Sequence, residues 1–147
     1  AAIAYTQTQQ PSKLDVVKLA DNMYVIHNDF VPGNTTVLVT NEGVLLVDGG
    51  SAAQSAALLQ TVRQLTGTDR IHTLFNTHWH WDQTGSNATL GPKGTQIIAH
   101  EKTRQRLSID QYRPEIDDYV KALPVATSPC AELAAATSWS IAVRCSA

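Results

Sequence analysis

Two histidines and one aspartate alternate with two tryptophans in the middle of the chain, in the order His78, Trp79, His80, Trp81, Asp82. In an extended segment, side chains two residues apart point the same way, so the imidazoles and the carboxylate can converge on one point. Imidazole and carboxylate groups favour zinc, with iron or manganese as alternatives. The spacing therefore predicts a divalent metal site whose bound water, with a pKa lowered toward about 7, acts as a nucleophile.

The elements before this segment are predicted to be four short strands divided by turn residues. They cover Leu14–Leu19, Met23–His27, Thr35–Thr40 and Val44–Val47. This pattern favours an antiparallel meander. The last two strands, joined by the three-residue loop Asn41-Glu42-Gly43, form the clearest hairpin signal in the sequence.

A helix is predicted after the meander, with Ser51 as its N-cap and Gly67 at its end, because apolar residues between them recur near helical spacing. The further elements expected are a strand over Ile71–Asn76, a polar loop over Thr77–Asn87, a strand over Gln96–Ala99 and a helix over Glu101–Gln111. This alternation of strands and helices is typical of an α/β protein.

The segment from Thr77 to Asn87 resembles the metal-binding loop of the metallo-β-lactamase superfamily, which reads T-H-x-H-x-D-H-x-G-G-N. The matching residues are Thr77, His78, His80, Asp82, Gly85 and Asn87. Gly43–Gly50 resembles the family's strand that ends in an Asp-Thr-Gly or Asp-Gly-Gly turn, and Asn34–Val39 resembles the strand before it. The resemblance covers roughly residues 14–123.

The resemblance implies a metal-dependent hydrolase, in which His78 and His80 hold zinc and Asp82, the catalytic residue, orients or deprotonates the attacking water. The bond attacked would be of the ester, thioester, lactone or lactam type, in a small-molecule substrate. The fold implied is of the α/β or α+β class and corresponds to about half of the αββα metallo-β-lactamase sandwich. Such a half is a mixed sheet covered by helices on one face.

Two departures from the family pattern concern the metal ligands. Gln83 stands where the family has a histidine that joins Asp82 in a second metal site, and an amide oxygen is a weaker ligand than imidazole. The family also supplies ligands from its C-terminal half, including two histidines, yet no histidine follows His100. With His78, His80, Asp82 and Gln83 as ligands, at most one weakly bound zinc ion is expected.

These departures leave an alternative function open. The chain could be a truncated, catalytically inactive member of the family that folds partly, or that self-associates through an exposed apolar sheet face.

Several other polar and aromatic residues lie in or near the segment from Thr77 to Asn87 or the predicted strands. Asp48 either forms an Asx turn with Gly50 or orients the loop histidines as a hydrogen-bond acceptor. Trp79 and Trp81 are interpreted as packing residues or as walls of a substrate site. No chemical role is assigned to His27, His72, His100, Cys130 and Cys145.

Length and composition fit one domain over residues 14–123, between a flexible N-terminal segment (1–13) and an atypical tail (124–147). The net charge of −2 gives no reason to expect nucleic acid or an anionic membrane as a partner. No apolar run approaches the roughly 20 residues of a membrane-spanning helix. The small, uncharged opening is typical of a mature N-terminus after signal removal, which favours a secreted or periplasmic location.

Overall fold

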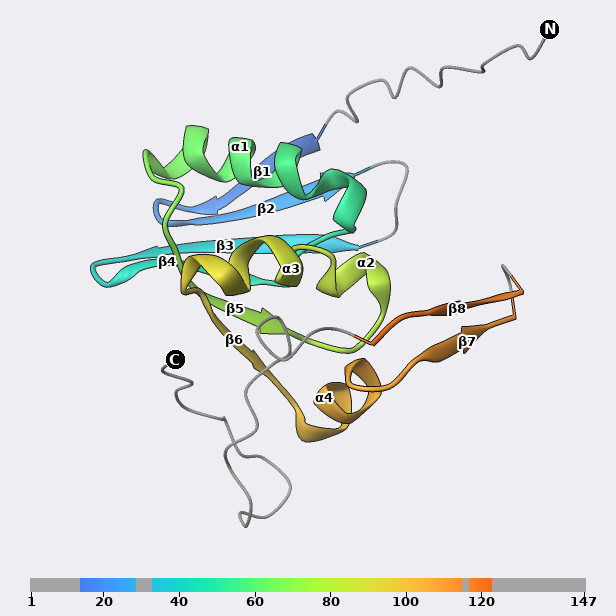
Figure 1. The fold of residues 1–147 in the computed structure, drawn as a ribbon. Coiled ribbons are helices and arrows are strands. Elements are labelled where there is room, and N and C mark those ends of the chain that lie inside the picture. The colour runs from blue at the N-terminus through green and yellow to red at the C-terminus, as the bar shows by residue number, and fades with distance from the viewer. Residues whose placement is uncertain (1–13, 29–32, 115–116, 123–147) are drawn as a thin grey trace, which may run out of the picture.

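The computed structural model of the chain describes residues 14–28, 33–114 and 117–122. They form a six-stranded sheet in the order β1-β2-β3-β4-β5-β6 and a separate two-stranded hairpin, β7-β8. The helices α1, α2 and α3 lie over one side of the sheet, as Figure 1 shows. The predicted N-terminal segment and the predicted tail lie outside the described residues.

The first four strands form the predicted antiparallel meander. They are β1 (Leu14–Ala20), β2 (Met23–Asn28), β3 (Asn34–Thr40) and β4 (Gly43–Val47). The predicted hairpin is formed by β3 and β4, but Thr40 pairs with Gly43, so two residues and not three lie between the strands. The Thr40 hydroxyl accepts a hydrogen bond from the Glu42 N–H and donates one to the Gly43 carbonyl, which closes this turn.

The second half of the sheet is parallel. The helix α1 (Ser55–Thr66) leads from β4 to β5 (Ile71–Asn76), and β6 (Gln96–Ala99) pairs with β5. As predicted, α1 ends at Gly67, whose φ of 75° is in the left-handed region that glycine adopts without strain.

The prediction that Ser51 caps this helix was wrong. A 3₁₀ turn, η1 (Ala52–Gln54), precedes α1, and the Ser51 side chain makes no cap hydrogen bond. The Ser51 side chain is instead buried, and the backbone of Ser51 and Ala52 packs directly against Gly85.

The loop after β5 is more structured than predicted. It contains α2 (Trp81–Thr84) and leads into α3 (Asn87–Leu90) and the 3₁₀ turn η2 (Gly91–Lys93). The helix α2 forms because the N–H groups of Gln83 and Thr84 and the Thr84 hydroxyl all donate to the His80 carbonyl.

The last predicted helix is shorter than expected. It is α4 (Glu101–Leu107), and Gln111 instead begins β7 (Gln111–Arg113), which pairs with β8 (Asp118–Val120). The Gln111 amide donates to the carbonyls of Arg106 and Ile109, so carbonyls near the helix end find a partner outside the helix. Of the helices in the described ranges, none has the length and apolar character needed to cross a membrane.

The core lies between the sheet and the helices. Cross-strand neighbours share a face, and on the helix side Ile26, Val37, Leu46, Leu74 and Ile97 are all buried. Leu58 and Val62 of α1 and Leu90 of α3 complete this cluster. Each such side chain contributes roughly 1.5–3 kcal/mol on burial, so this face fixes the sheet on which the loop after β5 rests.

The other side of the sheet, here called the second sheet face, is also rich in apolar residues. The register places on it the half-buried side chains of Met23, Val25, Leu38, Leu45, Val47 and Phe75. A mixed sheet with its helices on one face agrees with the fold class predicted from the sequence.

Candidate metal centre

The two loop histidines lie next to one another after the end of β5. His78 Nε2 and His80 Nδ1 are 3.2 Å apart, and the rings meet edge to face. Two nitrogens bound to one tetrahedral zinc at about 2.0–2.1 Å would be separated by about 3.3 Å. The donor atoms that face one another therefore fit two ligand positions of a zinc ion.

Asp82 does not join this pair. His80 has extended dihedral angles, φ −66° and ψ 150°, but α2 begins at Trp81, so Asp82 lies in the first turn of a helix. Asp82 therefore does not follow the extended alternation that was expected from the sequence. Within the described residues, no group of three His, Cys, Asp or Glu side chains is arranged to hold a metal ion.

Gln83 is a buried neighbour of Asp82. Its amide Nε2 donates a 3.0 Å hydrogen bond to Asp82 Oδ2. A Cβ at Gly33 would lie 2.8 Å from the same nitrogen, so the Gln83 side chain packs closely against the start of β3. This hydrogen bond orients the Asp82 carboxylate. Asp82 and Gln83 therefore form a second polar pair in the loop, in addition to the histidine pair.

The His78 ring is held from behind by a chain of hydrogen bonds. Thr77 donates to both carboxylate oxygens of Asp48, from its N–H to Oδ1 and from its hydroxyl to Oδ2, each at 2.8 Å. The Thr77 hydroxyl also lies 2.9 Å from His78 Nδ1. Because a hydroxyl has one proton, which goes to Asp48, the His78 Nδ1–H must donate to Thr77. This leaves the lone pair on Nε2, the atom that faces His80.

Asp48 is held in an unusual environment and backbone conformation. It is only 7% exposed, and burial raises the pKa of its carboxyl above its usual range, although the two hydrogen bonds from Thr77 oppose the shift. Its φ of 64° is left-handed, a conformation that Asp and Asn tolerate better than other non-glycine residues. Because Thr77 uses both oxygens, the geometry supports the interpretation of Asp48 as an acceptor that orients the loop.

Backbone contacts fix the loop to the turn after β4. The Gly49 N–H donates to the Gln83 carbonyl at 2.6 Å, and the Gly85 N–H donates to the Gly50 carbonyl at 2.8 Å. A Cβ at Gly85 would lie 2.1 Å from the Ala52 nitrogen, so this approach leaves no room for a side chain. The glycine at the family's position in the loop is thus required by packing.

Two asparagines and a serine that sequence reasoning left without a structural role also hold the loop. Asn87 Nδ2 donates to Asn76 Oδ1 at 2.8 Å, and the Ser86 hydroxyl donates to the Gly49 carbonyl. All three side chains are buried. Asn87 belongs to the family pattern, and the place of Asn76 at the end of a strand before a polar loop was the signal available for the second asparagine.

The other histidines have partners away from this site. His100 accepts a hydrogen bond from the Lys102 N–H and caps α4, while His72 Nδ1 lies 2.7 Å from the Thr73 hydroxyl. His27 Nδ1 lies 2.8 Å from Asn34 Oδ1. Trp79 and Trp81 line a hollow beside the loop, and both cysteines lie outside the described residues.

The family model and the solved structures that match the chain belong to the same protein family. The model of the metallo-beta-lactamase superfamily matches residues 28–138. Among solved structures, BJP-1, a subclass B3 metallo-beta-lactamase of Bradyrhizobium japonicum, aligns with a TM-score of 0.61 and 22% identity, covering 78% of this chain and 45% of that one. No curated protein matches the chain.

Two further solved structures have a similar fold. A metallo-beta-lactamase from Pontibacter korlensis aligns with a TM-score of 0.56 at 23% identity, covering 64% of this chain and 46% of that one. DIM-1 metallo-beta-lactamase gives a TM-score of 0.55 at 21% identity, covering 65% and 45%. The chain thus spans less than half the length of these structures, which agrees with about half of the sandwich.

Proposed function

The chain belongs to the metallo-β-lactamase superfamily, and from this premise we propose that it carries the metal-binding loop of a zinc-dependent hydrolase of small molecules. The bond cleaved is of the ester, thioester, lactone or lactam type. The observation that carries the proposal is the 3.2 Å separation of His78 Nε2 and His80 Nδ1, which fits two ligands of one zinc ion.

When bound, zinc would supply Lewis-acid chemistry, polarising a carbonyl and lowering the pKa of water. The residues near the proposed zinc site have different roles. Asp48 and Thr77 keep the proton of His78 on Nδ1, so that Nε2 is free to act as a ligand.

Asp82 is the residue proposed to orient and deprotonate the attacking water. Gln83 holds the Asp82 carboxylate by donating to Oδ2, which fixes one of its oxygens and leaves the other to accept a proton. Gln83 stands in the family's second metal position, where its amide oxygen would be a weak ligand.

A second candidate is an inactive member of the family. It is favoured by the number of ligands, because the described residues offer one pair of histidine nitrogens and no group of three metal-binding side chains. Structural zinc sites have four protein ligands and catalytic sites usually have three, so a two-nitrogen site alone would bind weakly.

Zinc binding by the purified chain distinguishes the two candidates. The experiment is a competition titration with a chromophoric chelator, together with elemental analysis, on the wild type and on His78→Ala/His80→Ala. The hydrolase proposal predicts close to one equivalent of zinc, bound more tightly than micromolar and lost in the double variant. His72→Ala, which removes an exposed histidine of β5, is the matched control and should bind as the wild type does.

A wild type that retains no more zinc than the double variant would contradict the hydrolase proposal for this chain and favour the inactive member. Denaturant unfolding of each variant shows whether the comparison is between folded proteins. If zinc binds, the same preparations justify a screen of ester, thioester, lactone and lactam substrates.

A further inference from the structure

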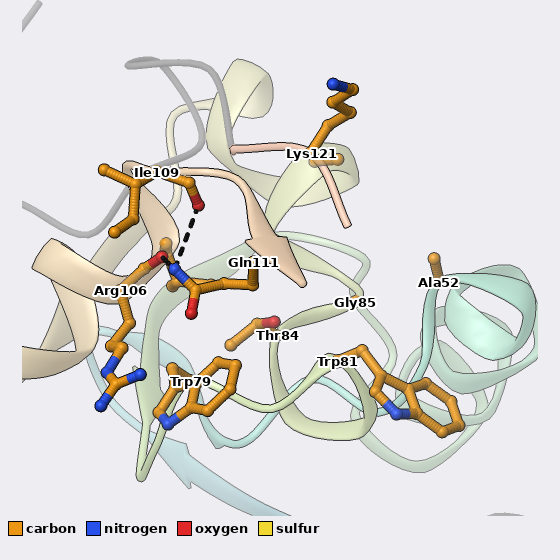
Figure 2. Close-up of a pocket in the computed structure, with 11 residues that line it drawn as sticks. Ala52, Trp79, Trp81, Thr84, Gly85, Arg106, Ile109, Gln111 and Lys121 are labelled. Atoms are coloured by element: carbon orange, nitrogen blue, oxygen red, sulfur yellow. Dashed lines mark hydrogen bonds between the residues drawn. The ribbon is translucent and has the colours of Figure 1, made fainter. Parts of the chain in front are cut away.

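A hollow of about 220 Å³ lies beside the metal loop and is here called the tryptophan pocket. Trp79 and Trp81 line it from the loop, and Arg106, Ile109 and Gln111 line it from the end of α4 and the start of β7 (Figure 2). Its volume is below the roughly 300–1,000 Å³ of a site for a whole drug-sized ligand. It therefore fits one part of such a molecule, such as a single ring or a short chain.

The walls of the tryptophan pocket are mainly apolar and open to solvent. Trp81 is 44% exposed and Ile109 is 59% exposed. Exposed large apolar side chains that gather around a hollow mark a binding site more often than isolated ones do. Indole rings in particular give a large, rigid surface on which another flat group can pack.

One cation of the tryptophan pocket has no carboxylate partner among the described residues. The Arg106 guanidinium carbon lies 5.3 Å from the centre of the Trp79 ring, and no carboxylate of the described residues pairs with it. The neighbouring cations differ in this respect, since Arg104 pairs with Glu101 at 2.6 Å and Lys121 pairs with Asp110 at 2.8 Å. Figure 2 also shows the Lys121 side chain directed away from the indoles.

A guanidinium that stacks on an aromatic ring keeps the N–H groups at its edge for hydrogen bonds. Arg106 is therefore placed to bind a carboxylate with two parallel hydrogen bonds, while the ligand's apolar part packs on the indoles. Trp79 also contacts His80, with ring centroids 4.7 Å apart. The Trp79 ring therefore lies between the tryptophan pocket and the histidine pair.

We propose that the tryptophan pocket binds an organic anion with an apolar ring or short chain, its carboxylate held by Arg106 and its apolar part by Trp79 and Trp81. The inference rests on the proposed function in identifying this anion as part of the substrate of the hydrolase. Binding in the tryptophan pocket does not itself need the metal, so the two proposals can fail separately.

The test is a titration of the metal-free chain, kept in chelator, with phenylacetate, followed by the backbone and indole N–H resonances in NMR spectra. Phenylacetamide, the neutral analogue, and acetate, which lacks the ring, are titrated in parallel. Saturable shifts at Trp79 and Trp81 are expected with phenylacetate. Phenylacetamide should bind about tenfold or more weakly, because it loses the charge-assisted hydrogen bonds.

Three variants test the residues named. Arg106→Gln should bind phenylacetate about tenfold or more weakly and should no longer distinguish it from phenylacetamide. Arg104→Gln, the matched control on the same helix, should bind phenylacetate as the wild type does. Trp81→Ala, an exposed position, should weaken the binding of both aromatic compounds.

Equal binding of phenylacetate by the wild type and Arg106→Gln would overturn the proposal, as would the absence of saturable shifts in the wild type. Zinc titration of Arg106→Gln keeps the two proposals apart. Unchanged zinc affinity with lost phenylacetate binding supports the tryptophan pocket as a separate subsite, whereas loss of both would contradict its independence from the metal.

Discussion

Asp48 is the residue on which the geometry of the histidine pair depends most. It is buried, it has a left-handed backbone, and both its oxygens accept hydrogen bonds from Thr77. The structure retains a carboxylate whose pKa is raised by burial, although an uncharged residue would be less costly to bury. Its use is to direct the Thr77 proton and, through it, the proton of His78.

Asp48→Asn tests whether the Asp48 carboxylate determines which nitrogen of His78 carries the proton. The Asn amide would donate to the Thr77 hydroxyl, the hydroxyl would donate to His78 Nδ1, and the His78 proton would move to Nε2. Zinc affinity should fall by about 10–100-fold, as for other residues that orient metal ligands. The measurements are a zinc competition titration and the histidine tautomers from long-range ¹H–¹⁵N NMR spectra. Asp69→Asn, at an exposed position, is the control.

An Asp48→Asn variant that keeps both the wild-type zinc affinity and the Nδ1–H tautomer of His78 would show that the ring is held by other contacts.

The stability of the metal-free chain should depend on pH through the same carboxyl. Because the folded-state pKa of Asp48 is raised, its favourable contribution is complete below its unfolded pKa of about 3.9 and is lost as the pH rises through the folded pKa. Wild type should therefore lose stability relative to Asp48→Asn as the pH rises from about 4 toward 7. Urea unfolding of both proteins in chelator measures this difference. A difference that stays constant or changes in the opposite direction contradicts the assignment.

At the scale of elements, the sequence was informative where one local rule decides the structure. Gly67 ends α1 because only a residue tolerant of left-handed φ suits that position, and alternating apolar residues between turn residues identify the meander. Prediction failed where a distant contact decides. Ser51 is buried where Gly85 packs against its backbone, and the Gln111 side chain donates to the Arg106 carbonyl at the end of α4.

In the candidate site, too, some features could be predicted from the local sequence and others could not. The spacing of His78 and His80 predicted that the two side chains face one another, and they do so although residues 77–79 form bends and not a strand. The expected convergence of Asp82 with them assumed an extended chain from His78 to Asp82, but α2 begins at Trp81. The hydrogen bond between Asn76 and Asn87 joins the end of β5 to the start of α3. It could not be predicted from the sequence of either element alone.

Gly85→Ala tests the contact between the loop and the turn after β4. The φ of Gly85 is −62°, so alanine suits its backbone and would stabilise the helix end if space were available. Because a Cβ would meet the Ala52 backbone at 2.1 Å, we expect a loss of about 1–3 kcal/mol or more in the free energy of unfolding. Urea unfolding measures it, and weaker zinc binding should accompany it.

Gly94→Ala is a useful comparison, because Gly94 has open space around it and a φ of 85°. It should lose only the cost of a left-handed alanine, about 1–2 kcal/mol. A Gly85→Ala protein as stable as the wild type would mean that the two backbones can move apart.

At the scale of the whole molecule, the two faces of the sheet differ in what covers them. The helices cover one face, while the second sheet face carries half-buried apolar side chains on β2, β3, β4 and β5. An apolar face of this kind favours association. The chain is therefore expected to form oligomers as its concentration rises.

Leu38→Glu, in the middle of the second sheet face, should shift the chain toward the monomer in light scattering after size-exclusion chromatography. Gln64→Glu, at an exposed position of α1 on the other side of the sheet, is the control and should leave the distribution unchanged. A wild type that stays monomeric across the concentrations tested contradicts the expectation.

The contacts that build the site also determine when it can form. The meander joins residues close in sequence, but the Asp48–Thr77 and Gly49–Ser86 contacts join residues 29 and 37 positions apart. Such contacts pay a larger loop-closure entropy and tend to follow local ones during folding. The histidine pair is therefore brought together late, so zinc bound at the proposed site should mainly lengthen the lifetime of the folded chain by slowing unfolding, with little effect on the folding rate.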